Sequence, residues 1–208
     1  VMKKLAFRFK KLQTLPGWLP FLLVFVLILR IPSFFHPYAY GDECIYLTLG
    51  EAVKKGLVFY RDIHDNKPPL LYLMAAVAGN VMWFRLILMI WNLVNVAVIW
   101  KLAERLIKKK WLVTLVTVLF GIFSSVPLIE GNIANGEIFM IMPITGAVLL
   151  LVTSYKLQVT SWRYFWVGIL FAIGFLFKVP VFFDMVGVGF WLIVYRAKGI
   201  AEVIKKIF

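Results

Sequence analysis

The stretch HPYAYGDECIYLTLGEAVKKGLVFYRDIHDNKPPLLY, residues 36–72, lies between long apolar runs and determines how the rest of the chain is arranged. It holds five of the ten carboxylates and both histidines, and it ends in a Lys-Pro-Pro step. The runs on either side are long enough to cross roughly 30 Å of hydrocarbon as helices. A polar segment held between two membrane spans is a place for chemistry at the membrane surface, so we expect a functional site here.

Composition places the chain among integral membrane proteins. It is 62% hydrophobic and 16% charged, with a mean hydropathy of +0.90, and a soluble domain cannot bury that much apolar surface. The apolar runs are continuous rather than alternating, which predicts helices and not a barrel. The net charge of +13 does not indicate nucleic acid, because the lysines and arginines cluster at the ends of apolar runs. The single cysteine, Cys44, excludes an internal disulfide and a multi-cysteine metal site.

The predicted fold is all-α, with about six transmembrane helices and a long first extracytoplasmic loop that carries short juxtamembrane helices. The last apolar run is too long for one ordinary helix, and Lys178-Val179-Pro180 and Asp184 interrupt it. Two short spans that meet at Pro180 are the simplest interpretation, and a re-entrant hairpin is the alternative. The predicted spans cover about residues 17–35, 82–107, 111–128, 137–157 and, in two parts, 164–195.

Charge distribution predicts the orientation of these spans. Most lysines and arginines fall at the N-terminus, around residues 101–110 and 156–163, and in the C-terminal tail, whereas most acids fall in the other loops. The positive-inside rule therefore predicts two cytoplasmic termini and an extracytoplasmic active face, in a plasma or inner membrane. The predicted organisation is a basic amphipathic cytoplasmic segment (1–16), a transmembrane module (17–196) whose first loop is 36–81, and a basic cytoplasmic tail (197–208) that we expect to be truncated.

The first loop carries signals for two short helices. Gly41-Asp42-Glu43 predicts a helix start, with Gly41 or Asp42 as the cap, and Gly56 predicts its end. The face expected to lie on the membrane comprises Ile45, Leu49, Ala52 and Val53. A second helix is predicted to begin at Pro68, which would put Lys67 at the interface.

A carboxylate, several cations and a membrane edge suit the transfer of a sugar from a lipid phosphate to an acceptor outside the membrane. The acceptor needs a general base, for which Asp42 is the candidate, and the leaving phosphate needs cations. The candidate cations are Arg61, Lys67, Arg85 and Lys178. Structural alternatives stay open, because Asp42 can be only a helix cap and Lys67 can be an interfacial anchor. His64 and Asp65 can be two metal ligands or two solvated loop residues.

These residues also form a pattern found in one family. The chain resembles the C superfamily of lipid-linked-sugar glycosyltransferases, in particular its protein O-mannosyltransferase and lipid A aminoarabinose transferase branch. Arg85 stands where the family has an arginine that opens the second span. The matching segments, in order, are Gly41-Asp42-Glu43 with Tyr46, residues 60–70 ending in Lys67-Pro68-Pro69-Leu70, Asn135-Gly136-Glu137-Ile138-Phe139, and residues 175–180 (FLFKVP).

The resemblance implies roles for single residues. It implies a site on the outer face and a polyprenyl-phosphate sugar donor, with Lys67 and Arg85 near the donor phosphate. It implies catalytic roles for the acidic pair Asp42 and Glu43, with Asp42 as the base, and for Glu137 as the second acid. The chain departs from the family's pattern at Asn66, where many relatives have an acid or histidine, and at Phe177 and Val179, where Thr and Gly are usual. No cofactor is assigned, and a divalent metal is left open.

The predicted function is a membrane glycosyltransferase, or its N-terminal module. The predicted partners are a polyprenyl-phosphate-linked sugar, a protein, lipid or glycan acceptor, and membrane lipids, without nucleic acid. Family members generally continue with more spans, so we expect further spans or a partner chain to complete the site. The alternatives are a non-catalytic membrane subunit or scaffold that binds lipid phosphate, and a small transporter, which the long external loop and the lack of an inverted repeat disfavour.

Overall fold

The computed structural model describes residues 15–37, 40–156 and 161–192, and within these ranges the regular structure is helical. An isolated bridge between Phe59 and Ile63 is the nearest approach to a strand in the described part of the chain. The all-α prediction is therefore confirmed.

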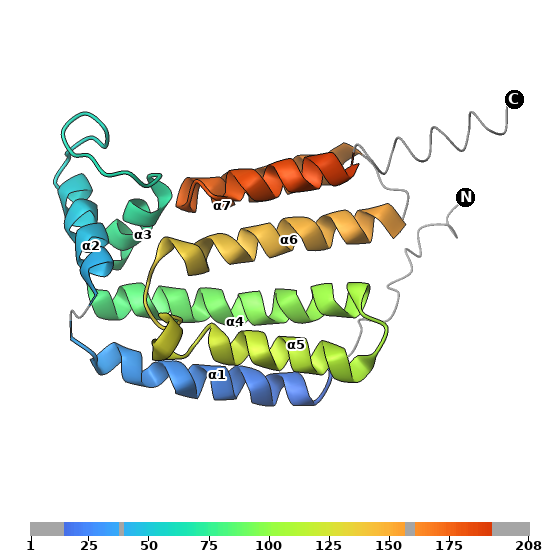
Figure 1. Cartoon of the computed structure of the whole chain (residues 1–208). Helices are drawn as coiled ribbons and strands as arrows, with labels where there is room; N and C mark the ends of the chain where they lie inside the picture. Colours follow the sequence, from blue (N-terminus) through green and yellow to red (C-terminus); the bar gives the residue numbers. More distant parts are fainter. Residues whose placement is uncertain (1–14, 38–39, 157–160, 193–208) are drawn as a thin grey trace, which may run out of the picture.

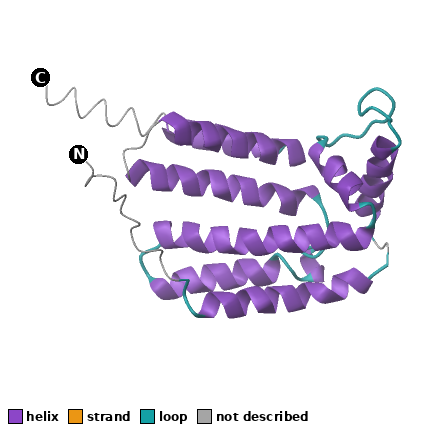
Figure 2. Cartoon of the chain, turned by 180° about the vertical axis from the view of Figure 1, so that it is seen from behind, coloured by secondary structure: helices purple, strands orange, loops and turns teal. Residues whose placement is uncertain are grey.

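Apolar helices lie side by side and form a bundle (Figure 1; Figure 2). A further helix, Val181–Leu192, packs through Val181, Val188 and Leu192 against the two bundle helices that precede it in the chain. The labelled helices of the bundle are α1 (Trp18–Phe35), α4 (Val81–Leu106), α5 (Lys110–Phe123), α6 (Gly136–Lys156) and α7 (Ser161–Phe177). Three of these, α1, α4 and α6, are long and apolar enough to cross a membrane, whereas α5, α7 and Val181–Leu192 are shorter apolar helices.

One end of the bundle gathers the segments that carry the predicted site residues (Figure 1). The helices α2 (Gly41–Lys54) and α3 (Leu70–Ala78) cover this end. The connection from α5 to α6, which includes the short 3-10 helix η1 (Pro127–Ile129), and the turn that follows α7 reach it as well. We call this end of the bundle the loop end.

A close backbone crossing holds α2 against α3. A Cβ atom at Gly50 would lie 2.6 Å from the backbone nitrogen of Ala76, so glycine is what lets the two helices approach this closely. Below them, the rings of Phe84 and Phe139 stack at 5.7 Å between centroids, and those of Phe139 and Phe177 stack at 5.3 Å. Because these rings come from α4, α6 and α7, the stack fixes three helices directly beneath the loop end.

The face of α2 that packs against protein is not the face predicted to lie on the membrane. Ile45 is 46% exposed, and the buried residues of α2 are Glu43, Tyr46 and Gly50. Helix spacing of apolar residues does not identify the packed face here, because in a membrane protein apolar residues can face lipid while polar residues turn toward protein. Arg30 and Arg85, which are 1% and 4% exposed inside the bundle, follow the same rule.

Several predicted boundaries shift by a few residues. The helix α3 begins at Leu70 rather than at Pro68, and α5 ends at Phe123 rather than near residue 128. The last apolar run is interrupted at residues 178–180, as predicted, but Asp184 lies inside a helix and does not break it. The predicted segment 1–16 and tail 197–208 fall almost entirely outside the described residues.

Candidate active site

The Asp42 carboxylate lies in the first turn of α2 and faces a lysine from the far end of the loop. Tyr40 occupies the cap position of α2 without a capping side-chain bond, so the prediction that Gly41 or Asp42 caps this helix is wrong. The Asp42 carboxylate instead accepts a hydrogen bond from Lys67 Nζ at 2.7 Å and another from Tyr46 Oη at 2.9 Å. Tyr46 reaches Asp42 because residues four apart lie on the same face of a helix.

Lys67 is held at the centre of these contacts. Its Nζ donates to Tyr46 Oη at 2.6 Å as well as to Asp42, and it lies 4.6 Å from the centroid of the Tyr46 ring. The backbone is anchored on both sides, because Tyr60 Oη donates to the Lys67 carbonyl at 3.1 Å and Pro68 is buried. The loop therefore presents this ammonium group in one defined place.

A second ion pair, between Lys178 and Glu137, comes from two other elements at the same end. Glu137 lies in the first turn of α6, and Lys178 follows the last residue of α7. The Lys178 ammonium donates to the Glu137 carboxylate. At Gly136, an added Cβ would lie 3.5 Å from the Lys178 side chain and 3.6 Å from that of Leu71, so the turn after α7, the start of α6 and α3 all meet here.

The two ion pairs interact electrostatically. The pKa of Asp42 is lowered, chiefly by the hydrogen bond from Lys67 and also by Tyr46 and the charge of Lys178, against the effect of burial. Burial lowers the pKa of Lys178, the charge of Lys67 lowers it further, and Asp42 opposes this. The Glu137 carboxylate in contact with Lys178 Nζ also favours the ammonium form. We call Asp42, Lys67, Glu137 and Lys178 the charge cluster.

Glu43 and Arg85, two other predicted site residues, form a separate buried pair. Glu43 is 0% exposed and accepts from Arg85 Nε at 3.0 Å and from Arg85 Nη2 at 2.5 Å. Arg85 Nη1 donates to the carbonyls of Ser33 and His36, and Glu43 also accepts from the backbone nitrogen of Ala134 at 2.7 Å. Arg85 thus donates to protein groups on both sides. Through these hydrogen bonds the pair connects α1, α2, α4 and the segment that precedes α6.

Arg61 lies apart from the charge cluster. Its guanidinium pairs with Asp62 at 2.8 Å, and the Arg61 side chain is 70% exposed. Asp62 also accepts from the backbone nitrogen of Val58, so the pair closes the exposed turn of the loop. The structure therefore brings four of the seven predicted site residues together, which are Asp42, Lys67, Glu137 and Lys178.

Arg30 is a buried cation to which the sequence analysis assigned no role. Arg30, in the C-terminal half of α1, donates to the carbonyls of Ser124 at 2.6 Å and Gly131 at 2.9 Å. It thereby holds the segment that leads to Glu137. The signal was present in the sequence, because a lone arginine inside a predicted span needs a partner or a role.

His64 and Asp65, the two candidate metal ligands, have protein neighbours. The His64 ring lies against that of Tyr60, and the Asp65 carboxylate accepts from Tyr72 Oη and from the backbone nitrogen of Asn66. Among the described residues, three or more His, Cys, Asp or Glu side chains do not gather into a group that could hold a metal ion. A divalent metal, which the sequence left open, stays open.

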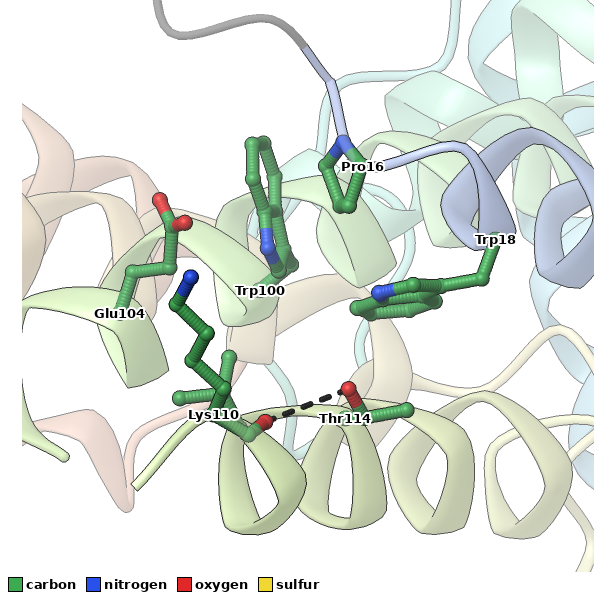
Figure 3. Close-up of a pocket in the computed structure, with 7 residues that line it drawn as sticks. Pro16, Trp18, Trp100, Glu104, Lys110 and Thr114 are labelled. Carbon is green, nitrogen blue, oxygen red and sulfur yellow. Dashed lines mark hydrogen bonds between the residues drawn. The ribbon is translucent and has the colours of Figure 1, made fainter. Parts of the chain in front are cut away.

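The described residues line several hollows, two of which lie at opposite ends of the bundle. At the loop end, a cavity of about 150 Å³ is lined by residues that include His36, Tyr40, Asn132 and Arg85, the partner of Glu43. A cavity of about 250 Å³ lies where α1, α4 and α5 meet, with none of the predicted site residues in its lining (Figure 3). Figure 3 shows the Lys110 side chain extending its ammonium group toward Glu104 at one side of this second hollow.

Comparison with known proteins supplies one match. The family described as dolichyl-phosphate-mannose-protein mannosyltransferase matches residues 67–207. Comparisons with curated proteins and with solved structures give no match. The matched stretch contains Lys67, Arg85, Glu137 and Lys178, whereas Asp42 and Glu43 lie before it.

Proposed function

The chain belongs to the dolichyl-phosphate-mannose-protein mannosyltransferase family, a group of membrane glycosyltransferases, and we propose that it transfers a sugar from a polyprenyl-phosphate donor to an acceptor on the outer face of the membrane. The observation that carries the proposal is the charge cluster. It sets a carboxylate that can act as a base within 2.7 Å of a lysine that can bind phosphate, with a second such pair beside them.

The proposed donor site consists of Lys67 and Lys178. When the sugar leaves a lipid phosphate, the bond between sugar C1 and the phosphate oxygen breaks and negative charge develops on that phosphate. Ammonium groups aimed at this position stabilise the leaving group. Lys67 and Lys178 suit this role because they come from different elements and lie close enough for the charge of Lys67 to lower the pKa of Lys178.

The proposed base is Asp42. It takes the proton of the acceptor hydroxyl while the hydroxyl oxygen bonds to C1, a step that typically gains about 10²- to 10⁴-fold in rate. Its side chain is 39% exposed, so an acceptor from solution can reach it. Glu137, 50% exposed, is the second acid and can orient a sugar or acceptor hydroxyl from the opposite side of the cluster.

For Glu43 and Arg85 we propose a positioning role, in place of the predicted catalytic role of Glu43 and the predicted phosphate contact of Arg85. Their buried pair fixes the start of α2, which carries Asp42, and the backbone at Ala134, three residues before Glu137. Arg61, exposed at the tip of the loop and paired with Asp62, is left out of the proposed donor site.

The proposed position of the charge cluster on the extracytoplasmic side of the membrane is supported by the charge distribution along the sequence. The acceptor is a protein, lipid or glycan hydroxyl, and the membrane supplies the donor lipid. Binding of a polyprenyl phosphate to the purified protein tests the donor site. Lys67→Met and Lys178→Met should each weaken binding, whereas Arg61→Met should not. Equal binding by all of these variants would remove the cluster from the donor site.

The predicted alternative, a scaffold that binds lipid phosphate without catalysis, shares this donor site. It differs in one result, because such a scaffold would bind polyprenyl phosphate and yet transfer no sugar.

A further inference from the structure

The charged groups of the charge cluster are paired with one another. Lys67 Nζ directs its donors to Asp42 at 2.7 Å and Tyr46 at 2.6 Å and also lies over the Tyr46 ring. Lys178 is paired with Glu137 in the same way. Two ammonium groups and two carboxylates leave the cluster without net charge. An incoming phosphate therefore gains little from the cluster unless it takes a lysine away from its carboxylate.

The exposed fractions of the side chains indicate which partner of each ion pair can move away from the other. In the first pair, the Lys67 side chain is 20% exposed and that of Asp42 is 39% exposed. In the second, Lys178 is 23% exposed and Glu137 is 50% exposed. In both pairs the carboxylate is the more solvated group, so it can turn into water while the lysine stays in place.

We propose that the donor phosphate competes with Asp42 for Lys67, and with Glu137 for Lys178, so that donor binding itself releases the base. This inference rests on the proposed function and deepens it. In the resting state Asp42 Oδ2 already accepts from both Lys67 Nζ and Tyr46 Oη, so an acceptor hydroxyl at that oxygen has to displace one of these donors. Once the phosphate occupies Lys67, the Asp42 carboxylate is free to meet the acceptor hydroxyl.

The exchange also changes the strength of the base. Lys67 contributes most to the lowered pKa of Asp42, with Tyr46 and Lys178 as lesser contributors and burial acting in the opposite direction. Loss of the Lys67 contact and arrival of a phosphate anion both favour the protonated carboxyl and so raise its pKa. Asp42 becomes a stronger base only when a donor is present, which makes donor binding the step that prepares the site for the acceptor.

Binding of decaprenyl phosphate, measured on the purified full chain in detergent, tests the competition. Asp42→Asn keeps the size of the side chain but removes the charge that holds Lys67. We expect it to bind decaprenyl phosphate about two- to fivefold more tightly than wild type, since an exposed ion pair of this kind contributes up to about fivefold in affinity. Asp62→Asn is the matched control, because its carboxylate pairs with Arg61 in the same loop; its affinity should equal that of wild type.

The outcomes separate the two proposals. Equal or weaker binding by Asp42→Asn overturns the competition and leaves the donor site intact. No binding by wild type or by either variant overturns the donor site and the competition with it. Tighter binding by both aspartate variants also overturns the competition, because the gain would then reflect only the net charge of the loop.

A second measurement needs no substitution in the tested protein. The chain has four aspartates, so carbon-13 labels at the aspartate carboxyls give a small set of signals. The signal that Asp42→Asn removes belongs to Asp42. Addition of decaprenyl phosphate to wild type should move the titration of this signal to higher pH and leave the Asp62 signal unchanged. An Asp42 signal that titrates at the same or a lower pH in the presence of the lipid overturns the competition.

Discussion

Arg85 donates to both carboxylate oxygens of Glu43, a residue 42 positions earlier in the sequence, and the two side chains are 4% and 0% exposed. Glu43 also accepts from Ala134, and Arg85 also donates to the carbonyls of Ser33 and His36. The pair therefore has its hydrogen bonds satisfied by protein and joins four segments at the loop end. This geometry favours a role in holding the site over direct contact with a ligand.

The first prediction separates these two roles. Arg85→Met leaves the buried Glu43 carboxylate without its positively charged partner, which should cost roughly 3–5 kcal/mol of stability. Thermal unfolding in detergent should show a lower midpoint, and Arg61→Met, at the exposed pair, should not shift it. Arg85→Lys should fall between them, because a single ammonium cannot replace the guanidinium fork. A well-folded Arg85→Met protein with an unchanged midpoint and lost lipid binding would restore the direct phosphate role.

The second prediction concerns the pKa of Asp42. It should lie below the ordinary value of 3.8, chiefly because of the hydrogen bond from Lys67. The ion pair then stabilises the folded protein fully above the unfolded-state pKa, and this contribution is lost as the pH falls through the lower folded-state pKa. Lys67→Met should raise the pKa of Asp42, which carboxyl carbon-13 titration can follow. An Asp42 that titrates identically in both proteins would mean that the contact is not formed in solution.

The third prediction is topological. With Cys44 replaced by Ser, a cysteine at Asn66, in the loop between α2 and α3, should react with an impermeant thiol reagent on intact cells. A cysteine at Lys109, between α4 and α5, should react only after the membrane is opened. Both positions are exposed in the protein, so the difference reports the side of the membrane. The reverse pattern would put the charge cluster on the cytoplasmic side.

The helices were largely predictable from the sequence, because long apolar runs determine where a chain can cross a membrane. The start of α2 at Gly41 and the interruption at residues 178–180 follow from local signals of the same kind. The packed face of α2 was not predictable from periodicity. Its buried residues include Glu43, and a charged residue on a packed face becomes understandable only when its partner from another helix is known.

The candidate site was predictable in its members but not in its pairing. Sequence reasoning selected Asp42, Lys67, Glu137 and Lys178 individually, and the structure brings them to the same end of the bundle. Sequence reasoning also assigned Arg85 to the phosphate. An arginine at the start of a span can bind either a ligand or a protein carboxylate, and the sequence does not distinguish these two partners. Contacts such as Arg85 with Glu43 depend on how distant helices pack, which a single sequence does not reveal.

The most direct test of the proposed function is transfer of radiolabelled mannose from a polyprenyl-phosphate donor by membranes that contain the protein. Wild type and Asp62→Asn should transfer at the same rate, and Asp42→Asn, with unchanged expression and unfolding midpoint, should be slower by roughly 10²-fold or more. The central claim is that the charge cluster supplies the base. Transfer by a well-folded Asp42→Asn protein at the wild-type rate would contradict it.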